Sequence, residues 1–138
     1  MFYSLQSKTP FKKFRLIFID NNPLILYTFQ MKDTSYIVIF IATSNRKEAE
    51  KIANALLAEK LAACVNILDG VHSLFWWQGK IDSSNEALLM VKTKSALLAD
   101  IIHRAKELHS YDVPEIIALP IVGGSQKYLS WISESVKG

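Results

Sequence analysis

One short segment in the C-terminal third of the chain holds four side chains that can bind a metal or move a proton. The segment LHSYDVPEI contains His109, Tyr111, Asp112 and Glu115. An imidazole together with two carboxylates is a ligand set that suits a divalent cation. The same composition also suits a connecting loop whose polar groups satisfy backbone amides. Because a lone histidine is a weak metal signal, the spacing leaves both interpretations open.

The single cysteine, Cys64, is a further candidate metal ligand. It lies in the apolar run AACVNIL, where cysteine usually packs as a small hydrophobic residue. A role as a soft ligand or redox thiol would need a basic neighbour that favours the thiolate. One cysteine excludes an intrachain disulfide and a multi-cysteine zinc site. His72 and His103 are isolated in sequence, and we expect both to be surface or packing residues.

Three adjacent aromatic residues, Phe75, Trp76 and Trp77, directly precede a predicted turn at Gln78-Gly79. Exposed apolar surface of this size marks an interaction site. A membrane-touching loop and a peptide-binding patch are alternatives to subunit contact, but only Lys80 lies near enough to favour a membrane. Strand alternation points the two tryptophans to opposite faces. We therefore expect one to serve the subunit's own core and the other a neighbouring subunit.

Strands and helices position these residues. Apolar runs rich in β-branched and aromatic residues predict the strands. A bulge or turn is expected at Asp69-Gly70, and Gln78-Gly79 joins two runs as an antiparallel pair. The predicted strands are SYIVIFIAT (35–43), AACVNIL (62–68), VHSLFWW (71–77), EALLMVKT (86–93) and PEIIALPIV (114–122).

Helices are predicted between these runs. Asn45, with Glu48 three residues later, has the spacing of a capping box. Ser95 is expected to cap a second helix, and SQKYLSWISESV predicts a short terminal one. The order β-α-β-β-α-β plus a helix predicts an α+β, ferredoxin-like sandwich with an extended β-hairpin arm. The apolar helix faces comprise Ala49, Ile52, Ala53, Leu56 and Leu57, then Leu97, Leu98, Ile101, Ile102, Ala105 and Leu108.

The net charge of +3 is concentrated at the N-terminus. Residues 1–31 contain four basic residues and one acidic residue, whereas the remainder contains 12 of each. The neutral remainder lacks the basic surface of a nucleic-acid binder, so we expect no nucleic-acid partner. No apolar run reaches the roughly 18–20 residues that span a bilayer, so we also expect no membrane partner.

Residues 1–34 are interpreted as an N-terminal extension, and residues 35–138 as the folded domain. The extension shows no sustained helical or strand period, which is typical of a poorly ordered tail or of an upstream start with Met31 as the working initiator. Basic residues ahead of an apolar stretch also fit a targeting leader. We expect a cytoplasmic protein, or an organellar or exported one if residues 1–30 are a genuine leader.

Several short motifs resemble those of the CutA family of divalent-cation tolerance proteins. They are AEKLAACVN, WQGK, the KT pair at 92–93, the H-x-Y-x-VPEI pattern at 109–116 and YLSW at 128–131. They occur in the family's order, and the resemblance covers about Tyr36 to Val136. It implies a ferredoxin-like subunit that assembles into a homotrimer, a role in tolerance of copper and other divalent metals, and no enzymatic activity. Copper binding is described for bacterial members, and animal relatives are linked to the membrane anchoring of an esterase.

The chain departs from the family pattern at its expected metal ligands. The family usually has His-Pro-Tyr-Glu where this chain has His-Ser-Tyr-Asp at 109–112. Some bacterial members have a cysteine where Ile41 stands here, and adjacent histidines where this chain has Leu108-His109. One retained imidazole cannot form a tight copper site within one subunit. We therefore expect only weak binding of Cu(II) or another divalent cation.

These considerations give three sets of candidate site residues. The alternative function is a small-ligand or anion sensor, or an enzyme, whose pocket lies in the clefts between subunits. The expected metal ligands are His109, Asp112, Glu115 and Cys64. The expected pocket residues are Trp77, Lys92, Tyr111 and Glu115. The expected trimer interface residues are Phe75, Trp76, Trp77 and Trp131.

Overall fold

The computed structural model describes residues 4–6, 13–19, 22–28 and 35–138. It divides the chain into two compact units, Met1–Asp33 and Thr34–Gly138. The first unit contains β1 (Ser4–Gln6), β2 (Lys13–Ile19) and β3 (Asn22–Thr28), which form an antiparallel sheet in the order β1-β2-β3.

Strands β2 and β3 differ from the sequence analysis, which found no strand period in residues 1–31. The two strands pair in continuous register from Lys13 opposite Thr28 to Ile19 opposite Asn22. The run LIFI within β2 is uninterrupted and apolar, so it has no alternation from which a strand could be recognised. The role of this unit as a tail or a leader stays a prediction.

The second unit is built on a four-stranded antiparallel sheet in the order β5-β6-β4-β7. The element order β-α-β-β-α-β, followed by a helix, confirms the predicted α+β fold. Its strands are β4 (Tyr36–Thr43), β5 (Cys64–Trp77), β6 (Lys80–Lys94) and β7 (Ile116–Pro120). Its helices are α1 (Arg46–Ala58), α2 (Leu98–Leu108) and α3 (Gln126–Ser135).

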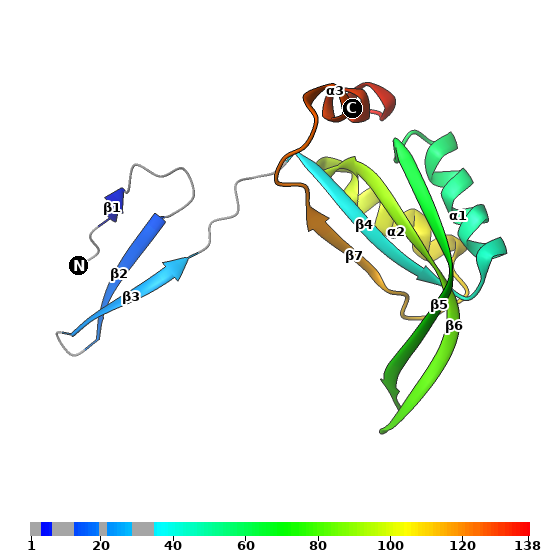
Figure 1. The fold of residues 1–138 in the computed structure, drawn as a ribbon, viewed down its shortest axis with the longest axis horizontal. Coiled ribbons are helices and arrows are strands. Elements are labelled where there is room, and N and C mark those ends of the chain that lie inside the picture. The colour runs from blue at the N-terminus through cyan, green and yellow to red at the C-terminus, as the bar shows by residue number, and fades with distance from the viewer. Residues whose placement is uncertain (1–3, 7–12, 20–21, 29–34) are drawn as a thin grey trace. The chain divides into compact units, whose positions relative to one another are not determined.

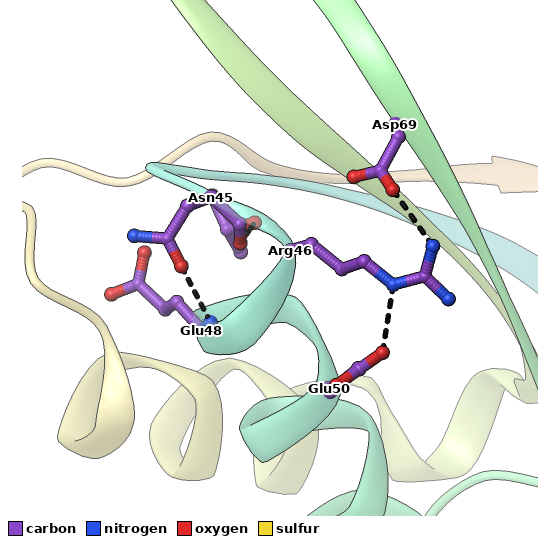
Figure 2. Close-up of polar contacts among 6 residues, drawn as sticks. Asn45, Arg46, Glu48, Glu50 and Asp69 are labelled. Atoms are coloured by element: carbon purple, nitrogen blue, oxygen red, sulfur yellow. Dashed lines mark hydrogen bonds and ion pairs between the residues drawn. The ribbon is translucent and has the colours of Figure 1, made fainter.

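The predicted N-cap of α1 is confirmed. The Glu48 amide donates to the Asn45 side chain at 2.9 Å (Figure 2). The start of α2 differs from the prediction, because Ser95 opens a 3₁₀ turn (Ser95–Leu97) and makes no side-chain cap bond. Both its amide and its hydroxyl instead donate to the Ser35 carbonyl. Within the described residues, no helix has the length and apolar character needed to cross a membrane.

Helices α1 and α2 lie on the same side of the sheet (Figure 1). On β4, burial alternates so that Ile37, Ile39 and Ile41 are buried and the residues between them are only partly buried. The apolar run of β4 predicted a strand, and α1 and α2 cover one face of the sheet to which it belongs. The covered face also contributes Ala87, Leu89 and Val91 of β6 to the core, which packs against Ala49, Ile52, Ala53, Leu56, Ile101 and Ala105 of the helices.

Strands β5 and β6 continue past the rest of the sheet as a two-stranded arm (Figure 1). The register shifts between Leu68 and Val71, which confirms the predicted irregularity at Asp69-Gly70. Gly70 adopts a φ of +69°, a conformation that glycine accepts without strain. At the tip, Gln78 and Gly79 both have positive φ, as a tight two-residue hairpin turn requires.

One ion-pair network connects the base of the arm to the body of the domain. Arg46, in the first turn of α1, lies 2.9 Å from Asp69 at the bulge and 2.8 Å from Glu50 on its own helix (Figure 2). These side chains are largely exposed, so the network contributes little to stability. Its effect is to orient the bulge relative to α1.

Candidate functional site

The candidate site is an open groove between the arm and the loop that follows α2. Its volume is about 900 Å³, within the range of small-molecule sites. Of the residues that line the groove, three are aromatic (Phe75, Trp77 and Tyr111) and four are acidic (Asp82, Glu86, Asp112 and Glu115). The remaining lining residues are Ala42, Ser73, Leu74, Ser83, Ser84, Ser110 and Val113.

His109 ends α2 and attaches the following loop to β4. Its Nε2 lies 2.7 Å from the Ala42 carbonyl oxygen, and its Nδ1 accepts a hydrogen bond from the Tyr111 amide at 3.0 Å. Because an amide can only donate, Nδ1 carries no proton and Nε2 donates to Ala42. The bonds therefore define a neutral imidazole whose two nitrogens are both engaged by the backbone.

Tyr111 connects this loop to the arm. Its hydroxyl donates to the Glu86 carboxylate at 3.2 Å, and its ring lies 5.0 Å from that of His109, centroid to centroid. Burial raises the pKa of the Tyr111 hydroxyl, and the negative charge of Glu86 raises it further. Tyr111 is thus a neutral donor at physiological pH, and it holds one wall of the groove against the other.

Glu48 binds the same loop from the side of α1. Its carboxylate accepts hydrogen bonds from the Ser44 amide and hydroxyl, each at 2.8 Å, and from the Ser110 amide. Partial burial raises the pKa of Glu48, but the hydrogen bonds from Ser44 and Ser110 outweigh burial and lower this pKa to about 2. A charged Glu48 therefore joins the β4–α1 turn to the start of the groove loop.

The structure brings together only part of the predicted metal-ligand set. Asp112 and Glu115 line the groove, and His109 lies behind it with both nitrogens bonded to the backbone. Cys64 lies four residues before Leu68 on β5, about 13 Å along the strand from the base of the arm. Among residues 35–138 and the described strands before them, no group of three or more His, Cys, Asp or Glu could hold a metal ion. The assignment of these residues as metal ligands stays a prediction.

The residues predicted to form a pocket between subunits also lie in two separate places within one chain. Trp77, Tyr111 and Glu115 line the groove, whereas Lys92 pairs with Cys64 at the other end of the sheet. The Lys92 ammonium lies 4.0 Å from the Cys64 sulfur. This basic neighbour is the one that a reactive thiol would require, and the place of Lys92 in a pocket between subunits stays a prediction.

Helix α3 packs beside this second cluster. Tyr128 and Trp131 lie 5.4 Å apart, centroid to centroid, and Trp131 is partly exposed. Burial raises the pKa of the Tyr128 hydroxyl, with a further contribution from Cys64. Trp131, a predicted interface residue, is therefore at the opposite end of the sheet from the arm aromatics.

The register of the arm shows which residues share each face. The side chains of directly opposite residues in antiparallel strands lie on the same face of the sheet. Phe75 therefore shares one face of the arm with Asp82, and Trp76 shares the other face with Ile81. The two tryptophans therefore lie on opposite faces, as predicted. The expectation that one serves the subunit's own core is wrong for the single chain, because Trp76 is 74% exposed and Trp77 is 57% exposed. The arm extends past the helices, so the core of the domain covers neither tryptophan.

Sequence analysis missed Glu86 and gave Glu48 only a capping role. The hairpin register could have indicated Glu86, since counting back from the Gln78-Gly79 turn places Ser84 and Glu86 on the Phe75 face. The hydrogen bond that the Ser110 amide donates to Glu48 joins residues 62 positions apart, so no local spacing could predict it.

The fold and the groove together define a ferredoxin-like domain with a projecting arm and an acidic, aromatic cleft at its base. The family model described as "CutA1 divalent ion tolerance protein" matches residues 37–135. The chain belongs to this family.

Comparison with individual proteins agrees with this assignment. The chain is 40% identical over 147 residues to Protein CutA, chloroplastic, of Arabidopsis thaliana, which covers 97% of this chain and 81% of the relative. It is 46% identical over 99 residues to the divalent-cation tolerance protein CutA of Archaeoglobus fulgidus, covering 72% of this chain and 96% of the relative. The crystal structure of CutA1 from Oryza sativa is similar with a TM-score of 0.73 and 43% identity, covering 77% of this chain and 98% of that one.

Proposed function

We propose that this protein acts as a homotrimeric divalent-cation tolerance protein that binds Cu(II) and other divalent cations weakly. Relatives carry the name divalent-cation tolerance protein, which describes tolerance of metal ions and no reaction. The observation that carries the assembly part of the proposal is the apolar surface left uncovered in the single chain.

The first part of this surface is the sheet face opposite α1 and α2. Register places Val38 with Leu119 and Phe40 with Ile117 on that face. Ile117 and Leu119 are 52% and 45% exposed, and Leu68 on β5 is 42% exposed. A sheet face of this composition is stable when a second layer covers it. Among the described helices, only α3 lies near it, where the Tyr36 hydroxyl hydrogen-bonds with Ser133.

The second part is the far face of the arm. Leu74, Trp76 and Ile81 share this face and are 66%, 74% and 65% exposed. A two-stranded ribbon with such a face is marginal in water. Burial of the three side chains against another copy would remove three large, exposed apolar groups from water.

The two edges of the sheet favour a closed ring. The edges are β5 and β7, which differ in sequence and length. A contact that joins one edge region of a copy to the other edge region of the next copy is heterologous, and heterologous contacts form a ring when the rotation between copies closes and an open filament when it does not. The trimer implied by the family resemblance is such a ring.

The geometry of His109 supports the expectation of a weak copper affinity. A Cu(II) ion bound at Nε2 would replace the hydrogen bond to Ala42, and one bound at Nδ1 would replace the bond from Tyr111. Either loss opposes binding by about 1 kcal/mol. Asp112 and Glu115 provide oxygen ligands on the same loop.

Isothermal calorimetry with Cu(II) tests this assignment. We expect His109→Ala to weaken copper binding by about tenfold or more, since it removes the main nitrogen ligand. His103→Ala is the matched control, because His103 is exposed on α2 and its Nδ1 lies 3.7 Å from Glu107. Equal copper affinity of the wild type and His109→Ala would show that His109 is not the ligand.

The chloroplastic relative supports the organellar alternative to a cytoplasmic location. That protein of Arabidopsis thaliana aligns with 97% of this chain, so the match extends into residues 1–30. We infer that these residues take part in targeting. Expression of the full chain with a C-terminal fluorescent protein, beside a variant that lacks residues 1–30, would test this; identical distribution of the two would contradict it.

A further inference from the structure

The charges of the arm are separated between its two faces. Lys80, Asp82 and Glu86 lie on the groove face, which is also the face of Trp77. The far face of the arm carries no aspartate, glutamate, lysine or arginine. Its one titratable side chain is that of His72, and its other members are Leu74, Trp76, Ile81, Ser83 and Asn85.

We propose that His72 makes the assembly of this protein sensitive to pH. The neutral imidazole allows the far face of the arm to pack against another copy, and the protonated imidazole opposes this contact. A face without fixed charges can be buried at little electrostatic cost, whereas a cation there must first be removed from water. The inference rests on the proposed assembly and concerns its regulation.

His72 lies within the surface that assembly would cover. It precedes Leu74 and Trp76 on the same face of β5, and successive residues on one face of a strand are about 7 Å apart. Leu74 is 66% exposed in the single chain, and His72 is exposed as well. Burial of Leu74 and Trp76 against a second copy therefore brings the His72 ring to the same contact.

The hydrogen bond of the His72 ring identifies the nitrogen that gains the proton. Its Nδ1 lies 3.1 Å from the side-chain oxygen of Asn85. An amide oxygen can only accept, so Nδ1 donates and the neutral ring keeps its lone pair on Nε2. Both charge states of the ring can make this bond, so Asn85 orients the imidazole without resisting protonation at Nε2.

The charged groups at the base of the arm leave no uncompensated cation beside His72. Helix α1 packs against β5, and Arg46 in its first turn lies 2.9 Å from Asp69 and 2.8 Å from Glu50. These three groups sum to one negative charge, which does not oppose a protonated ring in the single chain. Removal of the ring from water in the assembly is therefore the effect that disfavours the protonated form.

The sign of the effect follows from proton binding. Histidine changes charge between about pH 5 and pH 8, a range in which aspartate and glutamate stay largely ionised. Assembled subunits that hold His72 neutral bind fewer protons than separate chains, so acidification shifts the equilibrium towards separate chains. Between about pH 7.5 and about pH 5.5, each ring should lower the association constant by up to about tenfold, and the three rings of a trimer by up to about a thousandfold.

Light scattering of the full chain over a dilution series at about pH 7.5 and about pH 5.5, at constant ionic strength, tests the inference. We expect the wild type to dissociate at a higher protein concentration at the lower pH. The thermal midpoint at one fixed protein concentration is measured beside it, because the midpoint reports the same shift for a trimer too tight to dissociate on dilution.

Two substitutions of His72 reproduce its two charge states. His72→Gln is neutral at both pH values and keeps a side chain that can bond to Asn85, so its assembly should lose most of the pH dependence. His72→Lys is charged at both values, and its assembly at the higher pH should be as weak as that of the wild type at the lower pH. His103→Gln is the matched control, because His103 is exposed on α2, and it should retain the wild-type pH dependence. Circular dichroism checks that each variant is folded.

The outcomes separate this inference from the assembly itself. A wild type that scatters as a single chain at the higher pH would contradict the assembly, and the inference with it. A trimer of equal stability at both pH values, or a parallel fall for the wild type and His72→Gln, would overturn only the pH inference. A parallel fall would assign the effect to His109 instead, whose Nδ1 accepts a hydrogen bond from the Tyr111 amide and would lose it on protonation.

Discussion

Replacing Trp76 by alanine is expected to shift the protein from a trimer towards smaller species and to lower its thermal midpoint. The wild type should scatter light as about three times the 15.6 kDa chain mass. The midpoint of Trp76→Ala should also depend more steeply on protein concentration, because dissociation and unfolding become coupled.

The size of this effect follows from the position of Trp76. Its side chain is 74% exposed in the single chain and lies on the arm face that also carries Leu74 and Ile81. Truncation of an aromatic anchor at an interface costs about 2 kcal/mol or more. A threefold assembly repeats this loss at each contact, so the variant should lose roughly 6 kcal/mol per trimer if the contacts act independently.

Two comparison variants make the result specific. Trp76→Phe keeps an aromatic ring on the same face and should retain most of the assembly. Trp77→Ala, on the groove face, should also weaken the trimer, because Phe75 and Trp77 belong to the predicted interface. A wild-type protein that scatters as a single chain, with both arm tryptophans emitting as in water, would contradict the assembly and revive a membrane or peptide partner for the arm.

The strands and helices of the domain could be predicted because each depends on local pattern. The amphipathic face of α1, the Asn45 cap and the Gln78-Gly79 turn are all properties of a few consecutive residues. The longest discrepancy is β6, which begins at Lys80 rather than near Glu86. Apart from Ile81, its first residues, KIDSSN, are polar and have little β propensity, and they are a strand because β5 pairs with them along the arm.

The site was predictable only in part because it is assembled from distant segments. Tyr111, Asp112 and Glu115 were identified from one loop, and Phe75 and Trp77 from one strand. Their convergence depends on the bonds from Tyr111 to Glu86 and from His109 to Ala42, which span 25 and 67 residues. Lys92 lies opposite Cys64 near the far end of β6, away from this groove, and its place in a pocket between subunits stays a prediction. Tertiary pairing, rather than residue type, decides which charges share a groove.

The other large effect is expected at Glu48. Its carboxylate accepts three hydrogen bonds, two from Ser44 and one from Ser110, and its pKa falls from an ordinary 4.5 to about 2. A depressed folded-state pKa contributes stability that is fully present above the unfolded value and is lost as the pH falls towards the folded value. The contribution of Glu48 should therefore be complete above about pH 4.5 and disappear on acidification to about pH 2.

Glu48→Gln should remove most of this contribution. The full shift corresponds to roughly 3 kcal/mol, and partial exposure of the side chain reduces the expected loss to about 2 kcal/mol. At neutral pH the variant should unfold at lower urea concentration, whereas near pH 2 the two proteins should become similar in stability. The stability of the wild type should then fall more steeply than that of the variant between pH 4.5 and 2.

Urea unfolding at one fixed protein concentration, repeated across this pH range, measures the difference directly. Glu134→Gln is the matched control, since it neutralises an exposed carboxylate on α3 and should not change the slope. Parallel pH profiles of wild type and Glu48→Gln would contradict the depressed pKa, and with it the view that a charged Glu48 holds the loop in place.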